Sequence, residues 1–141
     1  MELHGKIAVV TGAASGLGLA TCKVLAAAGV RIAGFDRDEK KLQALKSNLG
    51  DACLARVVDV AEESSVKDGI AAVVAAFGGV HVAVNCAGVA DAAKTVSKGE
   101  PFPIATWNKV IAINLTGTFN VIRFAALAMT DRKSTRLNSS H

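Results

Sequence analysis

Lys6-Ile-Ala-Val-Val-Thr-Gly-Ala-Ala-Ser-Gly-Leu-Gly18 is the stretch that decides the fold of this 141-residue chain. Its apolar first half, residues 6–10, is typical of a buried parallel strand. From Ser15 to Ala28 the apolar side chains return at helical spacing, and Gly29 ends that helix. A glycine-rich turn between a strand and a helix offers backbone N–H groups and the positive end of the helix dipole to an anion such as pyrophosphate. A purely structural turn is the alternative, but the strand–turn–helix context favours nucleotide binding.

The same alternation of strand and helix patterns continues along the chain. It predicts further strands over 31–35, 54–58 and 81–84, and further helices over 38–49 and 62–77. Right-handed crossovers place such strands in one parallel sheet with helices on both faces. The sequence therefore predicts an α/β fold, a Rossmann-like doubly wound parallel sheet. Residues 90–103 predict a loop over the sheet edge, and residues 106–129 predict a long closing helix that Thr106 could cap.

The other predicted strands also end in residues that could contact a ligand. Asp36 ends the second strand, 18 residues after Gly18; Asp59-Val60 follows the third, and Asn85-Cys86-Ala87-Gly88 follows the fourth. Ligands of open α/β sheets bind outside the carboxyl ends of the strands, so we expect these segments to face one crevice. Taken singly, Asp59 could be a helix cap and Asn85 a turn residue.

Asp36 bears on the choice of dinucleotide. A carboxylate at this position can accept hydrogen bonds from the adenosine ribose hydroxyls and repels a 2′-phosphate, which favours NAD over NADP. Arg37, the next residue, could instead attract a 2′-phosphate, and Asp36 could also be a solvated loop residue. NADP therefore stays open as the alternative cofactor.

Taken in order, Thr-Gly-x-x-x-Gly-x-Gly, Asp-Val and Asn-Cys-Ala-Gly resemble the short-chain dehydrogenase/reductases, from residue 3 to about residue 130. The resemblance implies these cofactor-binding residues: Gly12, Ser15, Gly16, Leu17, Gly18, Asp36, Asp59, Val60, Asn85, Cys86, Ala87 and Gly88. Ser15 and Leu17 would line the pyrophosphate and nicotinamide site, and Asp59 and Val60 would bracket the adenine. Residues 85–88 would form the floor beneath the cofactor.

The resemblance also implies a catalytic role for Asn114, because the matching asparagine of relatives holds a water in the proton relay. From the residues alone, a helix asparagine with a local hydrogen bond is the alternative. A narrower resemblance, carried by residues 16–21, 84–88 and 117–123, is to the short-chain 3-hydroxyacyl-CoA dehydrogenases, also called type 10 hydroxysteroid dehydrogenases. It implies a small-molecule alcohol substrate, an acyl-CoA among the candidates, a hydride passed to NAD, and a homo-oligomeric parent enzyme.

Rival interpretations are a non-catalytic dinucleotide-binding module, an NADP-dependent ketoacyl reductase and an epimerase, because fold alone does not separate these functions. The family mechanism needs a tyrosine base with a lysine four residues later and a serine, and this chain contains no tyrosine. We therefore expect residues 1–130 to be the NAD-binding half of a dehydrogenase domain, inactive alone and poorly soluble because its fourth strand is an exposed edge. Residues 131–141 resemble translated sequencing adapter, which predicts a non-native tail.

Composition narrows the classes further. A hydrophobic content of 51% with 20% charged residues is typical of a globular protein. The net charge of +4 comes in part from the tail and forms no basic stripe, which argues against nucleic-acid binding. The three cysteines lack metal-ligand spacing, so no metal site is predicted, and their odd number argues against a disulfide framework. Without a signal peptide, and with its most apolar stretch (70–84) too short to span a bilayer, the chain is expected to be cytoplasmic and not membrane-bound.

Overall fold

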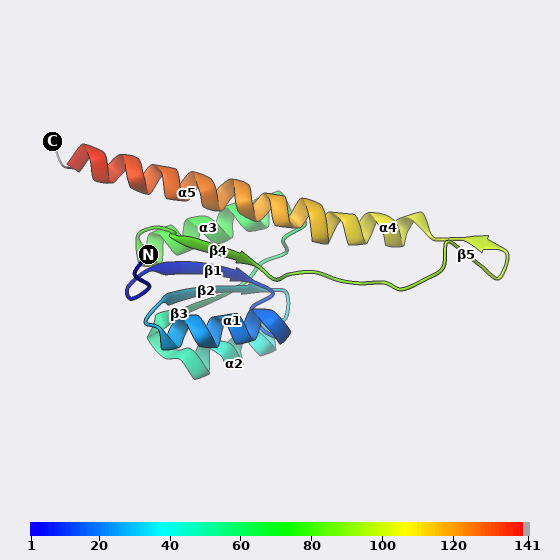
Figure 1. Cartoon of the computed structure of the whole chain (residues 1–141), viewed down its shortest axis with the longest axis horizontal. Coiled ribbons are helices and arrows are strands. Elements are labelled where there is room, and N and C mark those ends of the chain that lie inside the picture. Colours follow the sequence, from blue (N-terminus) through cyan, green and yellow to red (C-terminus); the bar gives the residue numbers. More distant parts are fainter. Residues whose placement is uncertain (140–141) are drawn as a thin grey trace.

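Four parallel strands form the central sheet of this computed structural model, which describes residues 1–139 and their side chains as far as Asp131. The strand order is β3-β2-β1-β4 (Figure 1). The strands are β1 (Ile7–Thr11), β2 (Arg31–Asp36), β3 (Cys53–Val57) and β4 (Val82–Asn85). The predicted Rossmann-like α/β fold is confirmed, and each predicted strand lies within a residue or so of its observed place.

Helices cover both faces of the sheet. On one face lie α1 (Gly16–Ala27) and α2 (Glu39–Leu49), followed by the short 3₁₀ helix η1 (Gly50–Ala52). On the other face lie α3 (Glu63–Phe77) and a long closing helix (Figure 1). That helix is made of α4 (Ile104–Ile111), a π-helical stretch η2 (Ala112–Gly117) and α5 (Thr118–Ser139).

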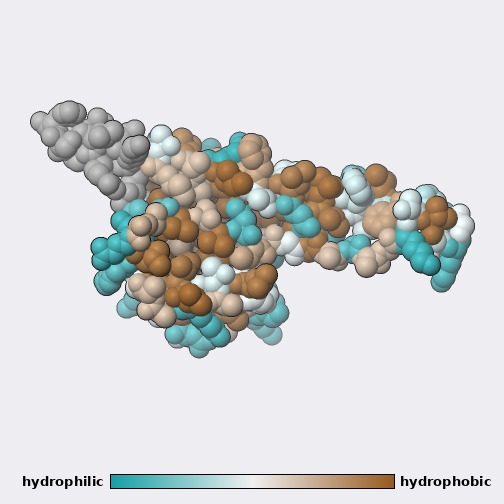
Figure 2. All heavy atoms as spheres, in the orientation of Figure 1, coloured by the Kyte–Doolittle hydropathy of each residue, from teal (hydrophilic) through white to brown (hydrophobic). Residues whose placement is uncertain are grey.

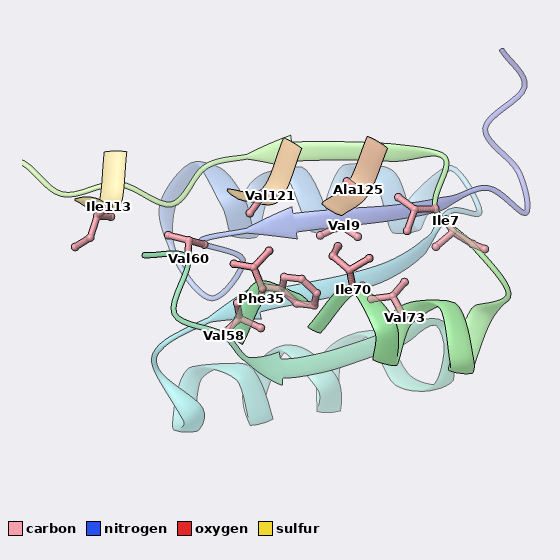
Figure 3. Packing of buried hydrophobic residues seen from close by; sticks show 13 residues of the cluster. Ile7, Val9, Phe35, Val58, Val60, Ile70, Val73, Ile113, Val121 and Ala125 are labelled. Atoms are coloured by element: carbon pink, nitrogen blue, oxygen red, sulfur yellow. The ribbon is translucent and has the colours of Figure 1, made fainter. Parts of the chain in front are cut away.

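The core is split by the sheet into two layers. All five residues of β1 are buried, because the strand is covered on both faces and alternate side chains enter opposite layers. Val9 belongs to the layer under α3 and α5, with Phe35 and Val121, as Figure 3 shows. Val10 belongs to the layer under α1 and α2, with Leu45. This double burial fixes β1 at the centre of the sheet, and with it the turn that follows.

The segment between β4 and α4 differs from the prediction. Residues 90–103 do not lie as a loop over the sheet edge; they extend away from the sheet and form a hairpin (Figure 1). The hairpin strands are β5 (Val96–Ser97) and β6 (Glu100–Pro101). Lys98 and Gly99 both have positive φ, 53° and 76°, which is the backbone of a tight two-residue hairpin turn.

The closing helix also begins earlier than predicted. Thr106 is not its cap: the helix starts at Ile104, and Pro103 occupies the N-cap position with φ −62° and ψ 125°. The carbonyl of Pro103 accepts hydrogen bonds from the N–H groups of Thr106 and Trp107, so Thr106 already lies within the first turn. Proline has a fixed φ near this value, which suits the start of a helix.

Much of the apolar surface of the closing helix is exposed. By length and composition alone, Ile104–Asp131 could cross a bilayer: an 18-residue window within it has a mean hydropathy of 1.5, and 22% of that window is buried. Its exposed large apolar side chains are Ile104, Trp107, Leu115, Phe119, Ile122 and Leu127. Figure 2 shows apolar surface along this helix and over the adjacent sheet edge, where β4 is the last strand of the described sheet, as expected. The predicted non-native tail stays a prediction, because side chains from residue 132 onward lie outside the described part.

Candidate functional site

A cavity of about 390 Å³ opens at the carboxyl end of the sheet. Of the twelve predicted cofactor-binding residues, eleven line it: Gly12, Ser15, Gly16, Leu17, Gly18, Asp36, Asp59, Val60, Cys86, Ala87 and Gly88. The twelfth, Asn85, is the last residue of β4 and pairs with Thr11 in the sheet. The cavity is also lined by residues that sequence reasoning did not place there: Phe35, Val58, Val89 and Ile113. The four predicted segments therefore meet in one crevice.

The N-terminus of α1 faces this cavity. Ser15 is the N-cap residue, and its hydroxyl caps no N–H in the described part of the chain. The first helical bond runs from the N–H of Leu19 to the carbonyl of Ser15, at 3.2 Å. The N–H groups of residues 16–18 therefore precede the helical ladder, and the described first turn holds no acidic side chain. This is the arrangement that a diphosphate requires.

One glycine lets the turn approach the floor of the cavity, residues 86–88, and a second lets α1 approach the turn. Gly12 has φ +62°, and a Cβ there would lie 2.9 Å from backbone atoms of Cys86 and Ala87. At Gly18, a Cβ would lie 2.6 Å from the carbonyl carbon of Gly12 and still closer to its oxygen. Backbone atoms cannot move aside as the end of a flexible side chain can. Both positions consequently admit only glycine without displacement of the turn.

Asp36 projects from the end of β2 toward the glycine turn. One carboxylate oxygen accepts a hydrogen bond from the N–H of Ala14 at 3.0 Å, and the other accepts one from the N–H of Asp38 at 3.0 Å. Each oxygen keeps lone-pair capacity for a further donor. The carboxylate thus braces the turn while its charge remains at the cavity, beside Arg37.

Thr11 supports the floor of the cavity, a contact that the sequence prediction missed. Its side chain is 1% exposed, and its hydroxyl oxygen accepts hydrogen bonds from the N–H groups of Cys86 and Ala87, both at 3.1 Å. The floor of the cavity is therefore attached to the central strand by one side chain. The available signal was a hydroxyl residue at the carboxyl end of the strand, directly before the first glycine.

Asp59 makes a local turn rather than a helix cap. Its carboxylate accepts a hydrogen bond from the N–H of Ala61 at 3.0 Å, and its own N–H donates to the Ser65 hydroxyl at 2.9 Å. The N-cap position of α3 belongs to Glu62, so the alternative prediction of a cap at Asp59 is wrong. This turn places Val60 in the cavity wall.

Asn114 makes a long-range contact. Its Oδ1 accepts from the N–H of Val89 at 2.8 Å, and its Nδ2 donates to the carbonyl of Val89 at 2.7 Å. The alternative of a purely local helix hydrogen bond is therefore wrong for this side chain. Asn114 lies in η2, and Val89, which it holds, lines the cavity. π-Helical turns often occur at functional sites, and a proton-relay role for Asn114 stays a prediction.

The three thiols differ in their surroundings. Cys22 and Cys53 are buried, as predicted; burial raises the pKa of the Cys22 thiol to about 12 and raises that of Cys53 as well. Cys86 is half-buried and lines the cavity. Because the thiolate is the reactive form, a thiol whose pKa lies far above the solution pH stays inert.

We therefore expect maleimide at about pH 8 to label Cys86 of the folded chain and to spare Cys22 and Cys53. All three should react after denaturation, and saturating NAD should slow the labelling of Cys86. Peptide mass spectrometry measures the three sites separately, with Cys86→Ser as the unlabelled control. Labelling of Cys22 in the folded chain as fast as that of Cys86 would contradict the expectation.

Among the described residues, no group of three or more His, Cys, Asp or Glu side chains could hold a metal ion. The cavity instead combines helix N–H groups, the hydrogen-bonded carboxylates of Asp36 and Asp59, and an apolar wall. This donor set suits a dinucleotide: the N–H groups fit its diphosphate, the carboxylate of Asp36 its ribose, and the wall a base.

Comparison with known proteins agrees with this geometry. Residues 6–137 match the model of the short chain dehydrogenase family. The chain is 42% identical over 127 residues to a Homo sapiens protein named 3-hydroxyacyl-CoA dehydrogenase type-2, covering 89% of this chain and 49% of that protein. It is also 42% identical over 121 residues to D-threitol dehydrogenase of Mycolicibacterium smegmatis, covering 84% and 45%. A third relative is galactitol 2-dehydrogenase (L-tagatose-forming) of Cereibacter sphaeroides, at 35% over 131 residues, covering 93% and 50%. The chain spans about half the length of these curated relatives.

Proposed function

This chain belongs to the short-chain dehydrogenase family, and from that premise we propose that it is the NAD-binding part of an oxidoreductase acting on a secondary alcohol or its ketone. The observation that carries the proposal is the meeting, in one cavity, of the N-terminus of α1 with the carboxylate of Asp36. These two features recognise the two parts of a dinucleotide that differ most in chemistry, a diphosphate anion and a ribose diol.

Each part of the cofactor has matching residues in the cavity. The N–H groups of residues 16–18 would hold the diphosphate, and Asp36 would accept from the adenosine ribose. Asp59 and Val60 would bracket the adenine, and residues 86–88 would lie beneath the cofactor. When bound, NAD supplies the acceptor for a hydride from the alcohol carbon, while the protein orients and excludes water.

NAD is proposed over NADP because of how Asp36 is held. Its two hydrogen bonds to the N–H groups of Ala14 and Asp38 fix a negative charge at the ribose end of the cavity. A 2′-phosphate at that place would meet this charge at close range. Arg37 also lines the cavity, but its side chain is exposed, so its attraction for a phosphate is screened by water.

The substrate proposal rests on the names of the relatives. A relative named for a hydroxyacyl-CoA and one named for a sugar alcohol have the same identity to this chain, 42%. We propose a 3-hydroxyacyl-CoA as the substrate of the parent enzyme because residues 84–88 and 117–123 resemble that group. Since the sequence has no tyrosine to act as the family's base, we propose that these 141 residues bind the cofactor without turnover. Homo-oligomeric assembly of the parent and a cytoplasmic location stay predictions; the exposed apolar face of the closing helix supports the first.

Calorimetric titration of the chain with NAD and with NADP tests the cofactor proposal. We expect NAD to bind and NADP to bind at least roughly tenfold more weakly, since 1.4 kcal/mol of charge repulsion corresponds to that ratio. Asp36→Ala should weaken NAD binding and reduce the discrimination between the two cofactors. The matched control is Asp51→Ala, at an exposed carboxylate outside the cavity, which should change neither. Equal affinity for both cofactors would refute the preference, and no binding of either would refute the proposed function.

A further inference from the structure

Asn120 is a buried polar residue that does not itself line the dinucleotide cavity. Among the described side chains, Asn120 and Thr11 are the polar ones that are buried, and Asn120 is 4% exposed. Its Nδ2 donates a hydrogen bond to the backbone carbonyl of Val60 at 2.9 Å, across 60 positions of sequence. A buried amide costs stability unless it is hydrogen-bonded, so this contact needs a reason beyond filling space.

The guanidinium of Arg123 sets the orientation of the Asn120 amide. A guanidinium nitrogen of Arg123 donates to Asn120 Oδ1 at 3.3 Å, and another lies 3.2 Å from a carboxylate oxygen of Glu63. A guanidinium has donors and no acceptor, so the amide atom that faces it must be the oxygen. The amide nitrogen is thereby directed at the carbonyl of Val60. Glu63, Arg123 and Asn120 therefore form one hydrogen-bond network that runs from the surface into the core.

This hydrogen-bond network ends on the backbone carbonyl of Val60. The Val60 side chain is 6% exposed, belongs to the core layer under α5, and lines the dinucleotide cavity. Figure 3 shows it between Val58, the residue after β3, and Ile113 of the closing helix. On the helix side it meets Gly117, where a Cβ would lie 2.6 Å from Val60 Cγ2. Gly117 therefore allows the close approach, and Asn120 holds the backbone in it.

We propose that Asn120, oriented by Arg123 and Glu63, is a positioning residue for the adenine end of the dinucleotide site, acting through Val60. The inference rests on the proposed function, because it assigns the adenine to the wall that Val60 forms. A wall residue attached only by the local turn at Asp59 could shift outward. The hydrogen bond from α5 prevents this shift and couples the closing helix to cofactor affinity.

The experiment uses the 141-residue chain and the fluorescent analogue 1,N6-etheno-NAD. We expect Asn120→Leu, which keeps the volume and removes the donor, to weaken binding of the analogue up to roughly tenfold, because losing the hydrogen bond leaves Val60 in its binding-competent position only part of the time. Iodide should also quench the bound etheno-adenine more strongly, because the base loses its wall. Quenching is measured on bound molecules, so a change in the folded fraction alone does not move it.

The matched control is Val73→Ala, a fully buried position in α3 that does not line the cavity. It should lower the melting temperature and leave both affinity and quenching unchanged. Wild-type affinity and quenching in folded Asn120→Leu would overturn the inference, as would equal changes in Val73→Ala. If Asn120→Leu does not fold, the test uses Arg123→Gln, at the exposed end of the hydrogen-bond network. Increased quenching in that variant supports the inference, and unchanged quenching overturns it. Failure of the wild-type chain to bind the analogue would instead remove the proposed function itself.

Discussion

Gly18→Ala is expected to abolish detectable NAD binding and to lower the free energy of unfolding by about 3 kcal/mol, the upper end of the usual cost of overpacking. The added Cβ would lie 2.6 Å from the carbonyl carbon of Gly12. Gly12 belongs to the backbone of the glycine turn and Gly18 to the first turn of α1, so relief requires the turn to open. An opened turn no longer directs the N–H groups of α1 at a diphosphate. Urea denaturation followed by circular dichroism measures stability, and calorimetry measures binding.

Gly78→Ala is the matched control for this substitution. Gly78 ends α3 with φ +95°, has no atom within 4 Å of a built Cβ, and lies outside the dinucleotide cavity. An alanine there costs about 1 kcal/mol of backbone strain and should leave NAD affinity unchanged. If Gly18→Ala behaved like Gly78→Ala in both measurements, close approach of α1 to the turn would not be what binding requires.

Thr11→Val is the substitution with the second-largest expected effect. Valine fills the same volume but leaves the N–H groups of Cys86 and Ala87 without the oxygen that now accepts both. A fully buried donor left unsatisfied costs about 1–3 kcal/mol, and these two donors are partly buried, so a loss of about 2 kcal/mol in unfolding free energy is expected. NAD affinity should fall as well, because the floor of the cavity loses its attachment to β1.

Thr11→Ser distinguishes the effect of losing the hydroxyl from the effect of losing packed volume. Serine keeps the oxygen and loses one methyl group, which costs about 1 kcal/mol. We therefore expect near-wild-type NAD affinity in Thr11→Ser and a clear loss in Thr11→Val, both measured by calorimetry beside thermal denaturation. A valine variant with wild-type affinity would show that the floor is held by the sheet alone.

The sequence was sufficient for most of the dinucleotide site because its signals are local. Apolar periodicity identifies β1 and α1, and the glycines of the turn lie between them. Asp36 was placed correctly by its position at a strand end, since parallel strands bring their carboxyl ends to one edge. Local signals were weaker at the closing helix, where Thr106 was a plausible cap by residue type. Pro103 took that place because its fixed φ suits a helix start.

By itself, then, the sequence determined the α/β fold, the glycine turn before α1 and the carboxylate of Asp36 beside it, all of which follow from residue type and spacing along short segments. Only the tertiary structure decided which groups the side chains of Thr11, Asn114 and Asn120 contact. Their partners lie 75 and 76, 25 and 60 positions away in the chain, respectively. Such hydrogen bonds depend on strand register and helix packing, and a polar side chain looks the same in sequence whether it faces water or a distant carbonyl.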